Sequence, residues 1–230
     1  MKSRFYYLGY HEKVAVAIKE YINSLDSFLT PETANSTRAV GDSLQSLVAD
    51  QLDILLGEWC REYSSDFARR AMADMAFTDI DGFHSTVDVK THREDTAFNM
   101  PNLTSIRRLA RLYESDIDYF SLIMIKYRID GKDVVVSEVL FLPIEFLDWR
   151  CLSIGALGWG QIQIANSNQI QIIQQNSRKR WMLQLCDAVM EFYPKEISKI
   201  SERIREFESV RDYWESKEDI WADDSLESHK

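Results

Sequence analysis

Cysteine is scarce in this chain of 230 residues, which contains only three: Cys60, Cys151 and Cys186. Because the three lie far apart, they form neither a disulfide framework nor the short ligand spacings of a zinc site. The four histidines show no ligand spacing either. We therefore expect three reduced thiols and no zinc.

Long apolar runs are also absent. No stretch reaches the roughly 18 consecutive apolar residues that a membrane-spanning helix needs, and the start, MKSRFYYLGYHEK, lacks the apolar core of a signal peptide. The composition, 45% hydrophobic and 28% charged, is ordinary for a globular protein. We expect a cytoplasmic protein with no membrane partner.

Positive charge is in deficit, since 27 lysines and arginines face 37 acidic residues and leave a net charge of -10. This argues against a general polyanion binder, whose affinity scales with the cations it presents. The acidic tail at 215–230 is expected to fray, and residues 1–214 are expected to form a single domain. Within that domain the charge can still be asymmetric.

The apolar pattern changes period along the chain and predicts helices, then a mixed sheet, then helices. Two hairpins are expected around Asp81-Gly82 and Asp130-Gly131, where glycine can supply a positive φ. Helices are expected at 10–29, 41–63, 102–114 and 178–217, the last interrupted near Pro194. The predicted fold class is α/β (α+β), with a central mixed β-sheet flanked by helices.

The stretch TVDVKTHR (86–93) places a lysine two residues after an aspartate in a β-branched run. Because side chains two apart on a strand share a face, Asp88 and Lys90 are expected to project together. Pairing about the turn at Asp81 places Asp74 opposite Asp88. Two converging carboxylates suit Mg²⁺, and a neighbouring lysine strengthens the positive field at a phosphate. The pattern therefore indicates a metal-dependent phosphodiesterase.

The bare Asp-x-Lys pattern is short, and an exposed, ion-paired strand face explains it as well. Asp79 and Asp81 compete with Asp74 for the role of first acid, although both lie in or beside the turn, where aspartate is common. The pairing geometry favours Asp74.

These residues resemble a known nuclease signature. Asp74 followed by Asp88-Val89-Lys90-Thr91 looks like the PD-(D/E)xK motif of type II restriction endonucleases, in particular the D-(V/I)-K-T form of the EcoRV/HincII-like group. Ala73 replaces the proline of the motif, a departure that HincII-like enzymes tolerate. Weaker likenesses follow in order over residues 39–165, in the segments 39–48, 96–112, 129–136 and 155–164.

The resemblance implies a restriction-endonuclease-like core and a homodimer around double-stranded DNA, with each subunit hydrolysing one strand. Asp74, Asp88 and the Val89 carbonyl would hold Mg²⁺, and Lys90 would act on the attacking water. Thr91 would contact a phosphate. Asp42 would hold a second metal or orient Lys90, or it is simply an acid at a helix N-terminus.

Base reading requires groups that can donate and accept hydrogen bonds in the grooves. Four amides, Asn99, Asn102, Gln161 and Gln163, are the best candidates, although the glutamines equally fit a solvated edge strand. Arg107 belongs to the basic segment RRLAR, which suits phosphate contacts or a solvated helix face.

The expected function is therefore a Mg²⁺-dependent type II restriction endonuclease that cuts a short palindrome, with blunt ends by analogy and a cognate DNA methyltransferase in the same system. A structure-selective repair nuclease of the same fold is the second interpretation. A noncatalytic DNA-binding protein is the third, disfavoured because the acids and Lys90 are all intact.

Overall fold

The computed structural model describes residues 2–65, 74–96, 102–165 and 170–218. Contacts divide the chain into two compact units, Met1–Leu185 and Cys186–Lys230. Each unit is described by itself below. The expectation of one domain over residues 1–214 stays a prediction, and most of the expected acidic tail lies outside the described residues.

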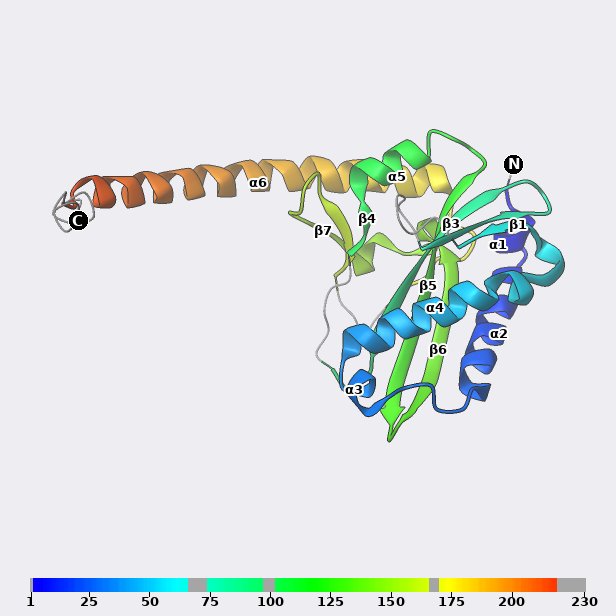
Figure 1. The fold of residues 1–230 in the computed structure, drawn as a ribbon. Coiled ribbons are helices and arrows are strands. Elements are labelled where there is room, and N and C mark those ends of the chain that lie inside the picture. The colour runs from blue at the N-terminus through cyan, green and yellow to red at the C-terminus, as the bar shows by residue number, and fades with distance from the viewer. Residues whose placement is uncertain (1, 66–73, 97–101, 166–169, 219–230) are drawn as a thin grey trace, which may run out of the picture. The chain divides into compact units, whose positions relative to one another are not determined.

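The first unit is built around a five-stranded sheet (Figure 1). Its strands, in spatial order, are β1 (Cys60–Ser64), β2 (Met75–Asp79), β3 (His84–Arg93), β5 (Asp118–Asp130) and β6 (Asp133–Pro143). The β3–β5 pair is parallel and the other pairs are antiparallel. The sheet is therefore mixed and β3 is its central strand, which confirms the predicted fold class.

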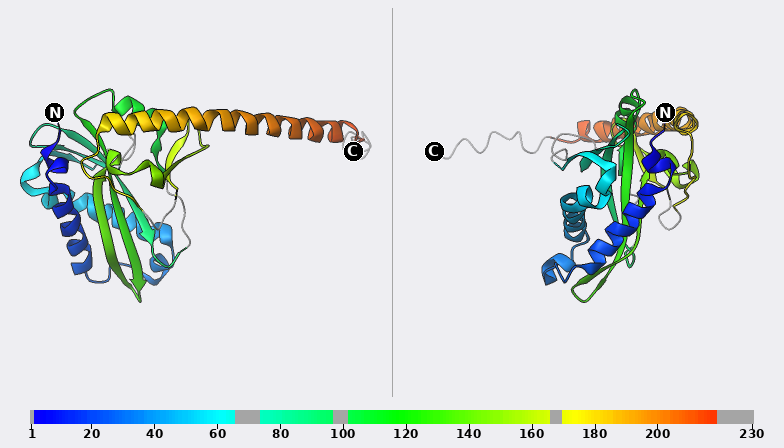
Figure 2. Two further views of the ribbon diagram at one scale, coloured as in Figure 1. Left: turned by 180° about the vertical axis from the view of Figure 1, so that it is seen from behind. Right: turned by 90° about the vertical axis from the view of Figure 1, so that its right-hand side faces the viewer.

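Helices pack against this sheet, and a smaller sheet follows. The first unit contains α1 (Arg4–Tyr7), α2 (Tyr10–Ser24), α3 (Pro31–Ala34), α4 (Thr37–Leu56), α5 (Ile106–Leu112), the short helices η1 (Gly57–Trp59), η3 (Ile144–Phe146) and η4 (Trp149–Cys151), and the start of α6 (Arg178–Glu215). Helix α2 packs on β6, α4 packs on β3, and the two helices touch each other (Figure 2). The small sheet has the order β4 (Asn102–Ser105), β8 (Gln161–Ile164), β7 (Leu152–Gly155).

Helix α4 shows why these residues form a helix on the core. Its buried side chains recur every four residues from Val40 to Leu56, which places them on one face. Ser36 caps the first turn by accepting a hydrogen bond from the Ala39 amide. The helix ends at Leu56 and is followed by Gly57, whose φ of 55° is costly for other residues.

Two of the predicted boundaries were wrong for the same physical reason. The helix expected at 41–63 ends at Leu56, and Cys60–Ser64 pairs with β2 as an edge strand. The helix expected at 102–114 begins only at Ile106, because residues 102–105 pair with β8. In both places a distant strand supplies backbone partners that override local helical periodicity.

The glycine turns were predicted correctly. Gly82 has a φ of 85° and Gly131 a φ of 64°. The β5–β6 hairpin closes with Asp130 opposite Asp133, and the β2–β3 register places Met75 opposite Val87. That register agrees with the pairing from which Asp74 was selected.

Two further helical boundaries differ from the prediction. Helix α2 ends at Ser24 rather than near 29, where the chain becomes extended at Leu25. Helix α6 runs without interruption from Arg178 to Glu215, with Pro194 inside it. The missing amide of that proline removes one hydrogen bond, and the helix nevertheless continues.

The part of the chain that the structure describes contains no helix long and apolar enough to cross a membrane.

Candidate active site

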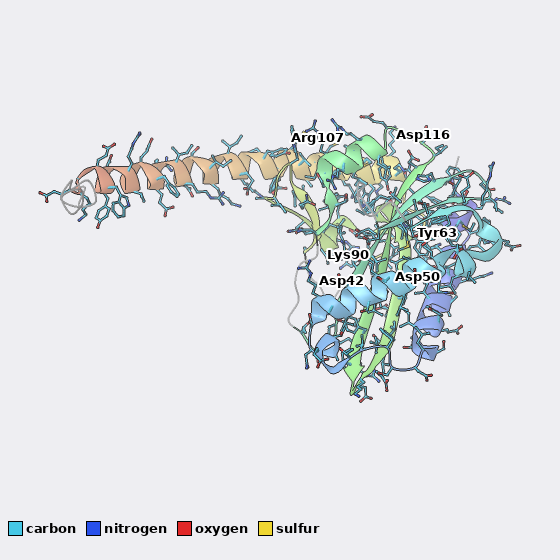
Figure 3. The ribbon with its side chains drawn as sticks, in the orientation of Figure 1. Asp42, Asp50, Tyr63, Lys90, Arg107 and Asp116 are labelled. Atoms are coloured by element: carbon cyan, nitrogen blue, oxygen red, sulfur yellow. The ribbon has the colours of Figure 1, made fainter. Side chains whose placement is uncertain are left out.

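The central strand β3 positions Asp88 and Lys90. Val87 and Val89 are buried, whereas Asp88 and Lys90 alternate with them and share the other face. Asp88 is only 8% exposed. Figure 3 shows Lys90 on β3 in the first unit. The strand thus presents a carboxylate and an ammonium group side by side at a nearly buried position.

The two charges form an ion pair, with Lys90 Nζ 2.7 Å from Asp88 Oδ2. The Lys90 ammonium group is therefore the partner of this buried carboxylate oxygen, and its charge and hydrogen bond both lower the pKa of Asp88. A carboxylate buried to this extent needs a neighbouring positive charge, which the lysine supplies here and which a bound cation could also supply.

Asp74 lies beside this pair at the start of β2. Its amide donates to the Val87 carbonyl over 2.9 Å, and its Oδ2 accepts from the Val89 amide over 2.7 Å. The carboxylate is therefore fixed by the backbone of β3, between the two residues Asp88 and Lys90. The structure brings together the three residues that the signature singled out.

Burial raises the pKa of both carboxyls above the ordinary value for aspartate. Burial raises the pKa of Asp88 to about 6, and the nearby Asp74 charge adds to the increase while Lys90 opposes it. Burial likewise raises the pKa of Asp74, against the lowering effects of the Val89 amide and of Lys90. Both carboxyls would be stabilised in their ionised form by an added cation.

The protein supplies part of a ligand set for Mg²⁺, and water and substrate would have to supply the rest. Within the described residues, no group of three or more His, Cys, Asp or Glu side chains could hold a metal. Asp74 and Asp88 supply two hard carboxylates, and the Val89 carbonyl faces the same side as its amide, toward Asp74. Mg²⁺ commonly accepts one or two carboxylates and completes its shell with waters and substrate phosphate. The residues present fit that pattern.

Asp79 and Asp81 have structural positions instead. Asp79 is 1% exposed and accepts hydrogen bonds from Ser3 Oγ and from the amides of Asp81 and Phe83. Asp81 forms an exposed ion pair with Arg4. Both carboxylates hold the β2–β3 turn and the N-terminal segment together.

Asp42 and Thr91 lie where α4 meets β3. Asp42 is exposed on α4 and forms no ion pair with any residue that the structure describes (Figure 3). Thr91 faces α4, since a Cβ added to Gly41 would lie 2.8 Å from Thr91 Oγ1. The structure therefore brings neither residue into contact with the Lys90 ammonium group.

A second candidate surface lies around α5. An open cleft of about 460 Å³ is lined by Ser105, Arg107, Arg108, Arg111, Gly158, Trp159 and Gln161. The guanidinium carbon of Arg107 lies 4.7 Å from the centre of the Trp159 ring. Three arginines and no carboxylate line the cleft, so it concentrates positive charge in a protein whose net charge is negative.

Of this cleft, the sequence singled out Gln161 and Arg107 with the rest of the basic segment RRLAR. The spacing of Arg107, Arg108 and Arg111 already places them on one side of a helix. Ser105 and Trp159 join them only because β4 pairs with β8. That pairing joins segments far apart in the sequence.

The remaining amides group separately. Asn102 lies opposite Gln163 across β4 and β8, and the Gln163 amide donates to Asn102 Oδ1 over 2.5 Å. β8 is the central strand of the small sheet, so the expected edge-strand alternative for these glutamines was wrong. Asn99 lies outside the described residues.

Comparison with known proteins gives no relative: no protein-family model matches the chain, and no curated protein matches it. The functional argument therefore depends on the geometry of the site.

Proposed function

We propose that the protein is a Mg²⁺-dependent type II restriction endonuclease that hydrolyses both strands of double-stranded DNA at a short palindromic site. The observation that carries the proposal is the grouping of Asp74, directly before β2, with Asp88 and Lys90 on β3, where the nearly buried Asp88 carboxylate lies 2.7 Å from the Lys90 ammonium group. The enzyme acts as a homodimer, produces blunt ends and works beside a cognate DNA methyltransferase.

The residues of the site have separate roles in this proposal. Asp74, Asp88 and the Val89 carbonyl would hold the ion, which when bound supplies Lewis-acid stabilisation of the phosphate. Lys90, oriented by Asp88, places positive charge at the scissile phosphate and orients the attacking water. Thr91 is assigned to a phosphate contact, and Asp42, which does not contact Lys90, is assigned to a second metal ion.

The arginine cleft supports a nucleic-acid substrate. Arg107, Arg108 and Arg111 can neutralise phosphates, and Gln161 in the same cleft can reach a base edge. Asn102, Gln163 and Asn99 complete the proposed base-reading set. A net negative exterior is compatible with DNA binding when the cations are concentrated in one place.

One observation favours a second candidate, a structure-selective nuclease of the same fold. Trp159 is 60% exposed in the arginine cleft, where an unpaired base could stack on its ring. A restriction enzyme that reads an intact duplex has less use for such a platform. This candidate predicts cleavage of branched or single-stranded DNA in place of a fixed site.

Digestion of unmethylated phage and plasmid DNA by the purified protein tests the proposal. Mg²⁺ is supplied in one arm and EDTA in the other, and the fragment ends are sequenced. Discrete fragments whose ends share one palindrome support the restriction enzyme. A smear, or cleavage confined to branched substrates, favours the second candidate, and intact DNA from several genomes contradicts both.

A further inference from the structure

The second unit exposes a row of large apolar side chains along α6. Each of the seven is between 36% and 70% exposed: Met190, Tyr193, Ile197, Ile200, Ile204, Phe207 and Trp214. Single exposed apolar residues are ordinary on a protein surface, but a continuous row on one helix marks an interaction surface.

The spacing of the row identifies the kind of partner. Successive members are three and four residues apart in alternation, so they occupy positions a and d of a seven-residue repeat that begins with Cys186 at d and includes Arg211 at a. An average repeat of 3.5 residues, sustained over about four heptads, is typical of a helix that supercoils with another helix. A helix lying on a sheet or globular core needs no such strict repeat.

The charges beside the row fit a second copy of the same helix. Arg203 occupies position g and Glu208 occupies position e of the next heptad. In a parallel, in-register pair of identical helices, position g of one chain faces the following position e of the other. Both side chains are exposed, and neither forms an ion pair with a residue that the structure describes. Each would gain an oppositely charged partner from the second copy.

Two details are consistent with this pairing. Pro194 occupies position e, beside the row rather than within it, so its ring does not separate the two helices. Arg211 is the one charged residue in the row, and its guanidinium lies 3.3 Å from Glu215 of its own helix. A single polar residue at position a lowers stability but fixes the register and the number of strands.

We propose that residues 186–215 pair with the same segment of a second copy as a parallel, two-stranded coiled coil. The paired length is about 45 Å at 1.5 Å of rise per residue. The pairing is measured without DNA or Mg²⁺ and does not depend on the proposed cleavage chemistry. A cleaving monomer would overturn the coiled coil alone, and an inactive dimer would overturn the nuclease alone.

Sedimentation equilibrium of the full-length protein tests the association. The wild type is expected at about twice the chain mass of 26.9 kDa. Ile204→Asp, which places a charge in the row, should raise the dissociation constant of the dimer at least about 100-fold. Ser198→Asp, at position b, adds the same side chain outside the row and should leave the dimer intact. Circular dichroism verifies that both variants are folded.

A monomeric wild type at tens of micromolar, a trimer or tetramer, or equal behaviour of the two variants would overturn the proposal.

The orientation of the two helices is tested by thiol cross-linking, which needs no destabilising substitution. In a parallel pair the exposed Cys186 of each copy faces the other. Diamide, which accepts the two protons and two electrons, should then join the two thiols as a disulfide in a Cys60→Ser background.

Cys186→Ser in the same background should abolish the covalent dimer. A noncovalent dimer that resists cross-linking at Cys186 would contradict the parallel orientation. Cross-linking that persists without Cys186 would show that the thiols meet elsewhere and would contradict the assignment of the row.

Discussion

At the scale of single residues, Asp88 combines burial with a charged neighbour on each side. Its carboxyl is nearly buried, Lys90 attracts its ionised form and Asp74 repels it. The net outcome is a pKa raised to about 6, so the site is partly protonated under mildly acidic conditions. A group in this condition is costly for folding alone and becomes useful when a cation is bound.

Lys90→Ala should reduce Mg²⁺-dependent DNA cleavage by about 10²–10⁴-fold, since the ammonium group that stabilises the phosphate is lost. DNA binding supported by Ca²⁺ should be retained. Asp81→Ala, which removes only an exposed ion pair with Arg4, is the matched control and should stay fully active. Wild-type cleavage rates in the Lys90 variant would make the catalytic assignment wrong.

The pKa of Asp88 predicts how stability changes with pH. Because the folded-state pKa is raised above its ordinary 3.8 to about 6, the contribution to stability is fully present below about 4 and is lost as the pH rises through 6. The metal-free protein should therefore lose up to about 3 kcal/mol from this group between pH 4 and pH 8. Asp88→Asn should remove that loss.

Urea denaturation across this pH range measures the effect. Asp81→Asn is the control, because Arg4 lowers the pKa of the Asp81 carboxyl. The contribution of Asp81 to stability is therefore lost as the pH falls, which is opposite to the contribution of Asp88. Mg²⁺ should restore stability to the wild type at pH 8 and not to Asp88→Asn, because bound metal requires an ionised ligand. A pH profile that is identical in the wild type and Asp88→Asn would contradict the assignment.

At the scale of elements, the strands with alternating patterns and Asp-Gly turns could be predicted, and with them the grouping of Asp74, Asp88 and Lys90. Edge strands could not. Segments 60–64 and 102–105 carry no clear alternation and become strands only through pairing with β2 and β8. The arginine cleft depends on that second pairing, so the sequence pointed to its arginines and to Gln161 but not to their meeting in one cleft.

The arginine cleft should contribute to DNA affinity through phosphate contacts. Arg107→Ala should weaken binding similarly on all sequences and reduce the slope of log affinity against log salt by about 1. Arg128→Ala, which removes an exposed arginine on β5, is the control and should leave the slope unchanged. Fluorescence anisotropy over a salt series measures both, and equal slopes for the two variants would remove the cleft from the interface.

Gly160 couples the small sheet to α5. It has a φ of 98°, and an added Cβ would lie 2.5 Å from Ile106 Cδ1. Gly160→Ala should therefore destabilise the protein by about 2 kcal/mol or more, from backbone strain and overpacking together. Gly131→Ala, at a φ of 64° with nothing within 4 Å of the added Cβ, should cost about 1 kcal/mol from strain alone. Equal losses in chemical denaturation would show that crowding at Ile106 is unimportant.

At the scale of the whole molecule, two features have to be reconciled with the proposed cutting of both strands. One chain contains one Asp74, Asp88 and Lys90 group, so a double-strand break by a single encounter requires two copies. In a parallel coiled coil, residue 186 of both chains lies at the same end, so the two paired segments begin side by side. The net charge of -10 on each chain opposes association at low salt and leaves the apolar row on α6 as its driving force.

The products of plasmid cleavage should therefore depend on protein concentration. Above the dissociation constant of the dimer, supercoiled plasmid should be converted to linear DNA, because both strands are cut in one encounter. Below it, nicked circles should accumulate first. Ile204→Asp should give nicked circles at concentrations where the wild type and Ser198→Asp give linear DNA. The substitution should lower the ratio of linear to nicked DNA more than it lowers the initial rate of strand cleavage per chain. Agarose gels of a plasmid that is cut once would show this. If Ile204→Asp is shown to be monomeric and still gives linear product, double-strand cleavage does not require the coiled coil. One subunit would then cut the two strands in sequence.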